Sequence, residues 1–453
     1  MASMAKYIFQ LVLFTLLYWG FSQHYPRFGI ILFIVIYVIQ IFHLFKISKY
    51  NSQPEFFSFN YLFFIMLTLI TYLIPIFHLL GLDDFVMYIS PVSYEIQYIP
   101  KSLYLTSVAV SSFTFGFAKK YRQTNISPDY SLLANISHHL SVAKITALLA
   151  FILFLYPFYM SYQTGMMDVE GIVVTLVSVA LIFSISIAGY SNLLYKHDLI
   201  SFILHNKLIL GIAGLIIFAM LFIGDRFFPL LILCSTAFII NHFVYKISLK
   251  EYFLLMFLGV IFMFYISFTR FSDDKSLGSA ISQYQMVTNT AVVFQDIVPI
   301  NLDFYLGLHY VDHKGFFLPE RILVFLLKPI PFIPGYLTEL FFGGNITTGD
   351  LLTPYNQTLV NVGSLQQGIG THCIVDIYMS WGILGVIALF ILFGCIVGMC
   401  YARLNNIYVL VAYVALVAGA IYIPRESLFS TFRIAIWVVI LAAFLLRKSN
   451  ICK

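Results

Sequence analysis

The chain has 453 residues, of which 61% are apolar, 18% are aromatic and only 10% are charged. Its mean hydropathy of +0.92 excludes a soluble globular protein, and its net charge of +5 comes with no basic patch of the kind that binds nucleic acid. Three of its five cysteines lie in apolar stretches, so no disulfide framework is expected.

Twelve stretches are apolar and long enough to cross a hydrocarbon core of ~30 Å, which takes about 20 helical residues. In chain order they cover residues 5–23, 28–46, 57–81, 102–119, 141–163, 171–194, 207–223, 227–245, 251–269, 373–401, 405–423 and 428–446. The first has no small-residue cleavage site, so we expect a retained helix and not a signal peptide. The sequence therefore predicts an all-α polytopic membrane protein with about 12 transmembrane helices.

Lysine and arginine collect in alternate loops between these stretches. Fifteen of the 25 fall on one side, which the positive-inside rule identifies as cytoplasmic. They are Lys6, Lys46, Lys49, Lys119, Lys120, Arg122, Lys144, Lys196, Lys207, Lys246, Lys250, Arg403, Arg447, Lys448 and Lys453. Both termini are therefore expected in the cytoplasm.

The pattern divides the chain into three parts. Residues 1–270 carry transmembrane helices 1–9, residues 271–371 form one long outer loop, and residues 372–453 carry helices 10–12. A loop of this length within a compact protein is usually functional or partly helical. Residues 322–335 are amphipathic and broken by prolines, which predicts short helices at the membrane interface.

Four arginines are expected at the outer end of the bundle. Placing a charged side chain at the end of a membrane helix or inside it costs a few kcal/mol, so four such residues at one face require an explanation. Arg226 follows a tight Gly-Asp turn, Arg270 ends the ninth span, and Arg425 and Arg433 flank the start of the last span. Guanidinium groups bind phosphate oxygens bidentately. The alternatives are arginines that reach lipid headgroups or pair with neighbouring acids.

An acidic residue, Glu426, lies close in sequence to Arg425 and Arg433. Glu426 follows Arg425 directly and precedes Arg433 by seven residues, a spacing that puts Glu426 and Arg433 on one face if Glu426 is helical. The pair is either structural or part of a substrate-binding site, because ionisable residues inside membrane spans usually have a function.

His372 lies directly before the tenth span, and Asp376 lies four residues later. On a continuous helix this spacing brings both side chains to one face within hydrogen-bonding reach. A histidine oriented by a carboxylate can act as a general base, Asp376 is itself a candidate base, and a capping histidine is the structural alternative.

The outer loop offers weaker candidates. Arg321 flanks the amphipathic segment, and Tyr355 and Asn356 are polar groups suited to sugar hydroxyls, although polar loop residues are usually only solvated. Asp83 and Asp84 form an acidic pair of the kind that binds metal ions in some glycosyltransferases, but one such pair is common by chance. We predict no metal site and no cofactor.

These features together resemble the O-antigen polymerase (Wzy) family of the bacterial inner membrane. The matching segments are Gly224-Asp225-Arg226, the long outer loop, Gly368-Ile-Gly-Thr-His372-Cys-Ile-Val-Asp376, Trp381-Gly-Ile-Leu-Gly385, and Pro424-Arg425-Glu426 with Arg433. His372 and the helix after it are also similar to the histidine region of O-antigen ligases. Where the polymerases commonly have Ser and Glu, this chain has His372 and Asp376.

The resemblance implies metal-independent glycosyl transfer between two undecaprenyl-pyrophosphate-linked oligosaccharides at the periplasmic face, in O-antigen or surface polysaccharide synthesis. Arg226, Arg270 and Arg425 would stabilise the pyrophosphate, and His372 or Asp376 would activate the acceptor hydroxyl. Arg321, Arg433, Glu426, Tyr355 and Asn356 would bind substrate. A chain-length regulator and a flippase are candidate protein partners, beside the lipid bilayer.

Three other functions stay open at this point. An O-antigen ligase would use the same donor with a lipid A-core acceptor. A flippase or other transporter would need charges along a path through the bundle, whereas the charges here gather at one face. A metal-dependent glycosyltransferase would use Asp83 and Asp84 and would lose activity on chelation.

Overall fold

The computed structural model describes residues 2–21, 26–49, 54–83, 96–121, 135–164, 172–223, 225, 227–269, 298–316, 327, 330, 340, 348–360, 371–428 and 431–446. These residues form helices and connections without a β-strand. The helices are α1 (Ala2–Phe21), α2 (Pro26–Ile47), α3 (Phe59–Leu79), η1 (Ile96–Tyr98), α5 (Ile99–Lys120), α7 (Ile136–Thr164), α8 (Ile172–Tyr195), α9 (Leu199–His205), α10 (Lys207–Ile223), α11 (Phe227–Phe243), α12 (Leu249–Thr269), α14 (Val298–Lys314), α17 (Thr348–Val360), α18 (Cys373–Tyr401), α19 (Ile407–Gly419), η3 (Ile423–Arg425) and α20 (Phe432–Leu445).

The outer surface of the helix bundle is apolar, as in a membrane protein. Within the described residues, six helices are long and apolar enough to cross a bilayer, and the bent pair α9 and α10 would make seven. Phe9, Phe42, Phe218, Leu384 and Phe444 are 66–79% exposed on this surface. Large apolar side chains that face outward in such numbers indicate contact with lipid, which is consistent with a polytopic helical membrane protein.

Each of the twelve predicted stretches contains a helix, but the last two helices are shorter than predicted. α19 has 13 residues and α20 has 14, which is about 20 Å each. The chain leaves the α-helix after Gly419 and forms the 3-10 turn η3 around Pro424, because proline lacks the N–H that would continue the helix. Arg425 and Glu426 therefore lie in an irregular connection and not on a spanning helix.

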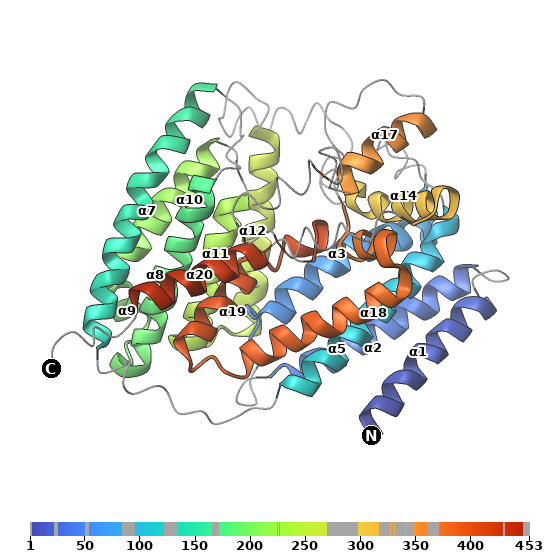
Figure 1. Cartoon of the computed structure of the whole chain (residues 1–453), viewed down its shortest axis with the longest axis horizontal. Helices are drawn as coiled ribbons and strands as arrows, with labels where there is room; N and C mark the ends of the chain where they lie inside the picture. The colour runs from blue at the N-terminus through green and yellow to red at the C-terminus, as the bar shows by residue number, and fades with distance from the viewer. Residues whose placement is uncertain are drawn as a thin grey trace.

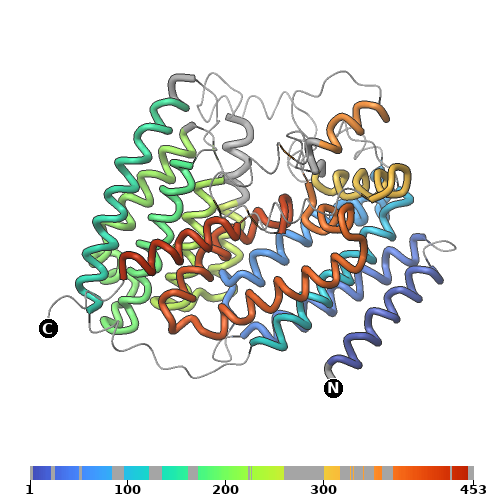
Figure 2. Tube along the Cα trace, in the orientation of Figure 1, coloured from blue at the N-terminus to red at the C-terminus, as the bar shows by residue number. Residues whose placement is uncertain are grey.

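The helices form two groups that are joined in the middle (Figure 1). In the first, α1, α2, α3 and α18 surround α5; in the second, α7, α8, α10 and α11 lie side by side. α19 and α20 pack on the second group, and α19 also contacts α3 and α18. The continuous trace in Figure 2 shows α18 leading from the first group into these two last helices.

The first group depends on one close helix crossing. Gly394 and Gly398 of α18 form a GxxxG motif that faces α5, and a Cβ on Gly394 would collide with the backbone carbonyl of Phe113. A Cβ on Gly398 would lie 2.8 Å from the carbonyl oxygen of Phe117. Small residues let membrane helices approach closely and gain van der Waals contact. The glycines therefore fix α18 against α5.

A buried carboxylate links the two groups at the end where α3 begins. Glu55 is fully buried, and its Oε1 lies 2.6 Å from Nδ1 of His242 and 2.7 Å from Nζ of Lys246. Tyr401 donates a hydrogen bond of 3.2 Å to the other oxygen. Burial alone would raise the pKa of Glu55, but the positive charges of His242 and Lys246 lower it below its usual value.

Candidate functional site

Three of the arginines predicted to bind substrate, Arg226, Arg270 and Arg321, lie outside the described residues. The turn before the first of them is partly described. Asp225 donates its backbone N–H to the carbonyl of Met220, and its Oδ1 accepts the N–H of Phe227 at 2.8 Å. Asp225 thereby caps the start of α11, which explains an acid in this short connection between two apolar helices.

His372 caps the start of α18. Its backbone is extended (φ −121°, ψ 127°), its Nδ1 accepts the N–H of Ile374 at 3.3 Å, and its Nε2 lies 3.1 Å from the hydroxyl of Thr71. Its side chain is fully buried, and burial lowers its pKa to about 3. The ring is therefore neutral at pH 7, with both nitrogens engaged by the protein.

The predicted hydrogen bond between His372 and Asp376 does not form between these two described residues. His372 stands before the helix and not within it, so the spacing of four residues does not stack the two side chains. Asp376 is 2% exposed inside the first turn of α18. The arrangement matches the capping alternative for His372, and Asp376 stays a candidate base.

The helix α14 brings a second acid to this end of the bundle. The ring of Phe304 stacks on the ring of His372 with centroids 4.3 Å apart. One turn further along α14, Gly307 faces α18 so closely that a Cβ would lie 2.6 Å from Val375. Asp303 lies four residues before Gly307, so it belongs to the helix face that packs against α18.

Asp303 is a buried carboxyl group without a hydrogen bond. It is 1% exposed, and neither of its oxygens has a hydrogen-bond partner among the described residues. Burial raises the pKa of Asp303 well above its usual value, and the positive charge of Arg425 offsets this only in part. A carboxyl group whose pKa is raised by burial is typical of general acids and bases.

Arg425 is an exposed cation whose charge acts on this acid. η3, which carries it, contacts both α3 and α18, and α14 contacts the same two helices. The guanidinium lies 5.7 Å from the ring centroid of Tyr422 and stays exposed. An exposed guanidinium above a buried carboxyl can bind an anion while the acid handles a proton.

Arg433 and Glu426 do not share a helix face. Glu426 has an extended backbone (φ −133°, ψ −151°), and Arg433 is the second residue of α20. Arg433 donates to the hydroxyl of Thr175 on α8 at 2.9 Å. The predicted seven-residue spacing fails because Glu426 is extended and α20 begins only at Phe432, so Arg433 lies near the start of α20 and not two turns deep.

The loop residues Tyr355 and Asn356 lie on α17 and help to hold α14. The hydroxyl of Tyr355 lies 2.6 Å from Nδ1 of His309, and Asn356 is fully buried. On the other side of α14, Lys101 of α5 pairs with Asp312 at 2.6 Å. The contact between Tyr355 and His309 helps to position the helix that carries Asp303, whereas Asp312 lies on its exposed surface.

The acidic pair near residue 83 is also engaged. Asp83 lies 2.9 Å from Nδ1 of His78, and Asp84 falls outside the described residues. Within the described part of the chain, no group of three or more His, Cys, Asp or Glu side chains is placed to share a metal ion.

Asp303 was missed by the sequence analysis because it lies in the long outer loop, where polar residues are expected to be solvated. The available signal was its neighbourhood: it is flanked by Leu302 and Phe304 within a run suited to a buried helix. Comparison with known proteins adds no assignment, because the chain matches no family model, no curated protein and no solved structure.

Proposed function

We propose that this protein is a glycosyltransferase that polymerises undecaprenyl-pyrophosphate-linked oligosaccharide repeat units. The observation that carries the proposal is the exposed Arg425 whose charge acts on the buried carboxyl of Asp303, a group with no hydrogen-bond partner among the described residues. Both lie at one end of a helical membrane protein, where a lipid-linked substrate would present its charged headgroup. The finer expectations of twelve spans, cytoplasmic termini, a bacterial inner membrane and a periplasmic site belong to the same proposal.

The reaction needs a cation and a base. The acceptor hydroxyl oxygen attacks the anomeric carbon of the donor sugar, the bond from that carbon to the pyrophosphate oxygen breaks, and the pyrophosphate leaves with its negative charge. Arg425 would stabilise this charge, together with Arg226 and Arg270, the two other arginines that the family resemblance assigns to the pyrophosphate. Asp303 would accept the proton of the acceptor hydroxyl.

We assign the role of base to Asp303 in preference to His372, and Asp376 stays the alternative base. Burial raises the pKa of Asp303 above that of an ordinary aspartate and lowers the pKa of His372 to about 3, which makes His372 a very weak base. Because Asp303 is almost fully buried, the entering acceptor must uncover it. The burial of Asp303 before the acceptor binds also keeps water away from this base. Water is then less readily activated to attack the donor sugar, which disfavours hydrolysis.

The test uses the purified protein in detergent with EDTA and one lipid-pyrophosphate-linked repeat unit as the only substrate. A ladder of products on a gel is the expected result. A ladder that disappears when EDTA is added would contradict a metal-independent reaction. If an authentic repeat unit gives no ladder, transfer to lipid A-core would identify a ligase, and movement of the unit across proteoliposomes would identify a transporter.

A further inference from the structure

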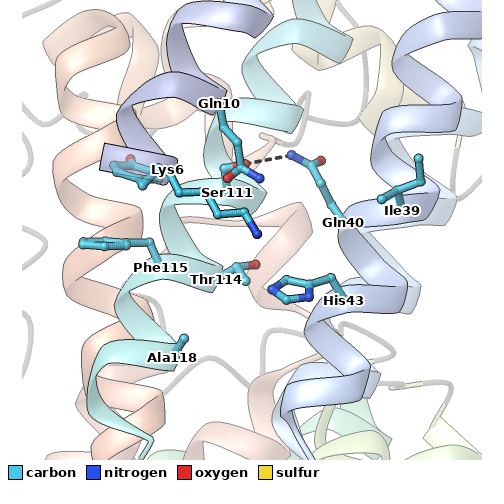
Figure 3. Close-up of a pocket in the computed structure, with 10 residues that line it drawn as sticks. Lys6, Gln10, Ile39, Gln40, His43, Ser111, Thr114, Phe115 and Ala118 are labelled. Atoms are coloured by element: carbon cyan, nitrogen blue, oxygen red, sulfur yellow. Dashed lines mark hydrogen bonds between the residues drawn. The ribbon is translucent and has the colours of Figure 1, made fainter. Parts of the chain in front are cut away.

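A cavity lies between α1, α2 and α5, at the opposite end of the first helix group from α14, and its lining is mainly apolar with a few polar side chains. It has a volume of about 430 Å³ and is lined by Lys6, Tyr7, Gln10, Ile39, Gln40, His43, Ser111, Thr114, Phe115 and Ala118. Figure 3 shows the Lys6 ammonium ending between Thr114 and the ring of His43. The space is large enough for a lipid headgroup.

The inner wall of this cavity contains polar atoms that lack partners. Gln40 donates from Nε2 to the carbonyl of Ser107 and to the hydroxyl of Ser111, whereas its Oε1 has no hydrogen bond among the described residues. The hydroxyl of Thr114 has no hydrogen-bond partner in the described part of the chain either. Both oxygens are buried behind the surface of the cavity, so a ligand reaches them only after these side chains turn towards it.

One further group gives the cavity a positive charge. Lys6 is exposed and has no hydrogen bond or ion pair among the described residues. The imidazole of His43 also lines the cavity. A phosphate group would accept hydrogen bonds from Lys6, whereas Lys119 on α5 does not line the cavity.

The mouth of the cavity opens on the apolar surface. Ile39 lines the cavity and is itself 63% exposed, next to Val35, Val38 and Phe42 on the same exposed face of α2. On α1, Phe9 is 66% exposed beside the lining residue Gln10. A ligand with its polar end at Lys6 would therefore have its remaining length along lipid-facing side chains, which fits an acyl chain and not a free ion.

We infer that this cavity binds the phosphate headgroup of an anionic membrane lipid. The lipid belongs to the leaflet at the end of the bundle where α1 begins, which the charge pattern predicts to be cytoplasmic. The phosphate contacts Lys6 and the ring of His43, and the acyl chains lie against α1 and α2. This site is separate from Arg425 and does not depend on the proposed reaction.

Delipidated protein in a nonionic detergent tests the inference by native mass spectrometry. Dioleoyl phosphatidylglycerol is the probe, and dioleoylglycerol, which has the same chains without phosphate, is the matched ligand control. We expect a saturable single complex with the first lipid and none with the second. Equal binding of both lipids, or full competition by inorganic phosphate at equal concentration, would overturn the assignment.

Substitutions locate the bound lipid. Lys6→Gln should weaken binding about five-fold, as expected for one cation near a lipid phosphate, and Lys6→Arg should restore it. Lys119→Gln, an exposed lysine at the same end of α5 that does not line the cavity, should leave affinity unchanged. Equal losses in Lys6→Gln and Lys119→Gln would show a diffuse surface attraction and contradict a site in the cavity.

Discussion

Two buried carboxyl groups at opposite ends of the molecule have opposite surroundings. Glu55 has hydrogen bonds from His242, Lys246 and Tyr401, and its pKa is lowered. Asp303 has no hydrogen-bond partner among the described residues, and its pKa is raised. A buried acid that the protein satisfies contributes to structure, whereas one left unsatisfied stores free energy that a substrate can use.

The largest effect on stability is expected from Glu55→Gln. The change removes the negative charge that the buried His242 and the 43% exposed Lys246 contact. Losing one partner of a fully buried ion pair costs about 3–5 kcal/mol, and the exposure of Lys246 puts the expected loss at the lower end of that range, about 3 kcal/mol. The free energy of unfolding, measured with denaturant in detergent, should fall by this amount while the activity per folded molecule stays near wild type. A large loss of activity without a loss of stability would break the comparison.

Arg425→Ala should affect catalysis and leave stability nearly unchanged. Removing one group that stabilises a developing negative charge typically lowers kcat by 10²–10³, about 3 kcal/mol. Steady-state kinetics on the lipid-linked repeat unit measure this, with Arg403→Ala, an exposed arginine beyond the far end of α18, as the matched control. Identical kinetics in the two variants would remove Arg425 from the site.

Gly394→Leu should destabilise the first helix group without touching either acid. The new side chain would collide with the backbone of α5 at Phe113, and overpacking of this kind costs about 1–3 kcal/mol. Thermal unfolding in detergent should show the loss. Gly211→Leu on α10, where a side chain meets open space, is the control and should be nearly neutral.

The smallest expected effect is a difference in pH dependence between the two acids. The folded-state pKa of Glu55 is below its usual value near 4.5, so its contribution is present above that pH and is lost as the pH falls through the folded-state pKa. Asp303 has a folded-state pKa above its usual value near 3.8, so its cost appears as the pH rises through and above that value.

Unfolding free energies of wild type, Glu55→Gln and Asp303→Asn across this pH range measure both contributions. The deficit of Glu55→Gln should shrink towards acidic pH, and any advantage of Asp303→Asn should grow as the pH rises. Parallel curves for the two variants would show that the two acids have similar surroundings.

The sequence located the helices better than it located the chemistry. Apolar runs predict spans because each helix must face lipid or other helices, and every predicted run contains a helix. The ends of α19 and α20 could not be predicted because Pro424 and local capping decide them. The spacing of Gly394 and Gly398 in the sequence forms a GxxxG motif, but the sequence does not indicate that α5 is the helix that packs against it.

The candidate site shows where reasoning from spacing reaches its limit. His372 and Asp376 are four residues apart, yet His372 is a cap and the spacing argument requires a helix that includes both. Asp303 acquires its character only from burial against α18 and from the charge of Arg425, which lies 122 positions further along the chain. Contacts of this kind between distant segments cannot be inferred from one sequence.

Asp303→Asn tests the central claim most directly, because asparagine keeps the shape of the side chain and removes its ability to accept a proton. The purified variant is compared with Asp312→Asn on the same helix, whose carboxylate pairs with Lys101 on the surface. We predict that kcat for repeat-unit polymerisation falls about 10²–10⁴-fold in Asp303→Asn alone, with unfolding free energy unchanged or higher. Polymerisation at the wild-type rate in Asp303→Asn, with its normal pH profile, would contradict the account.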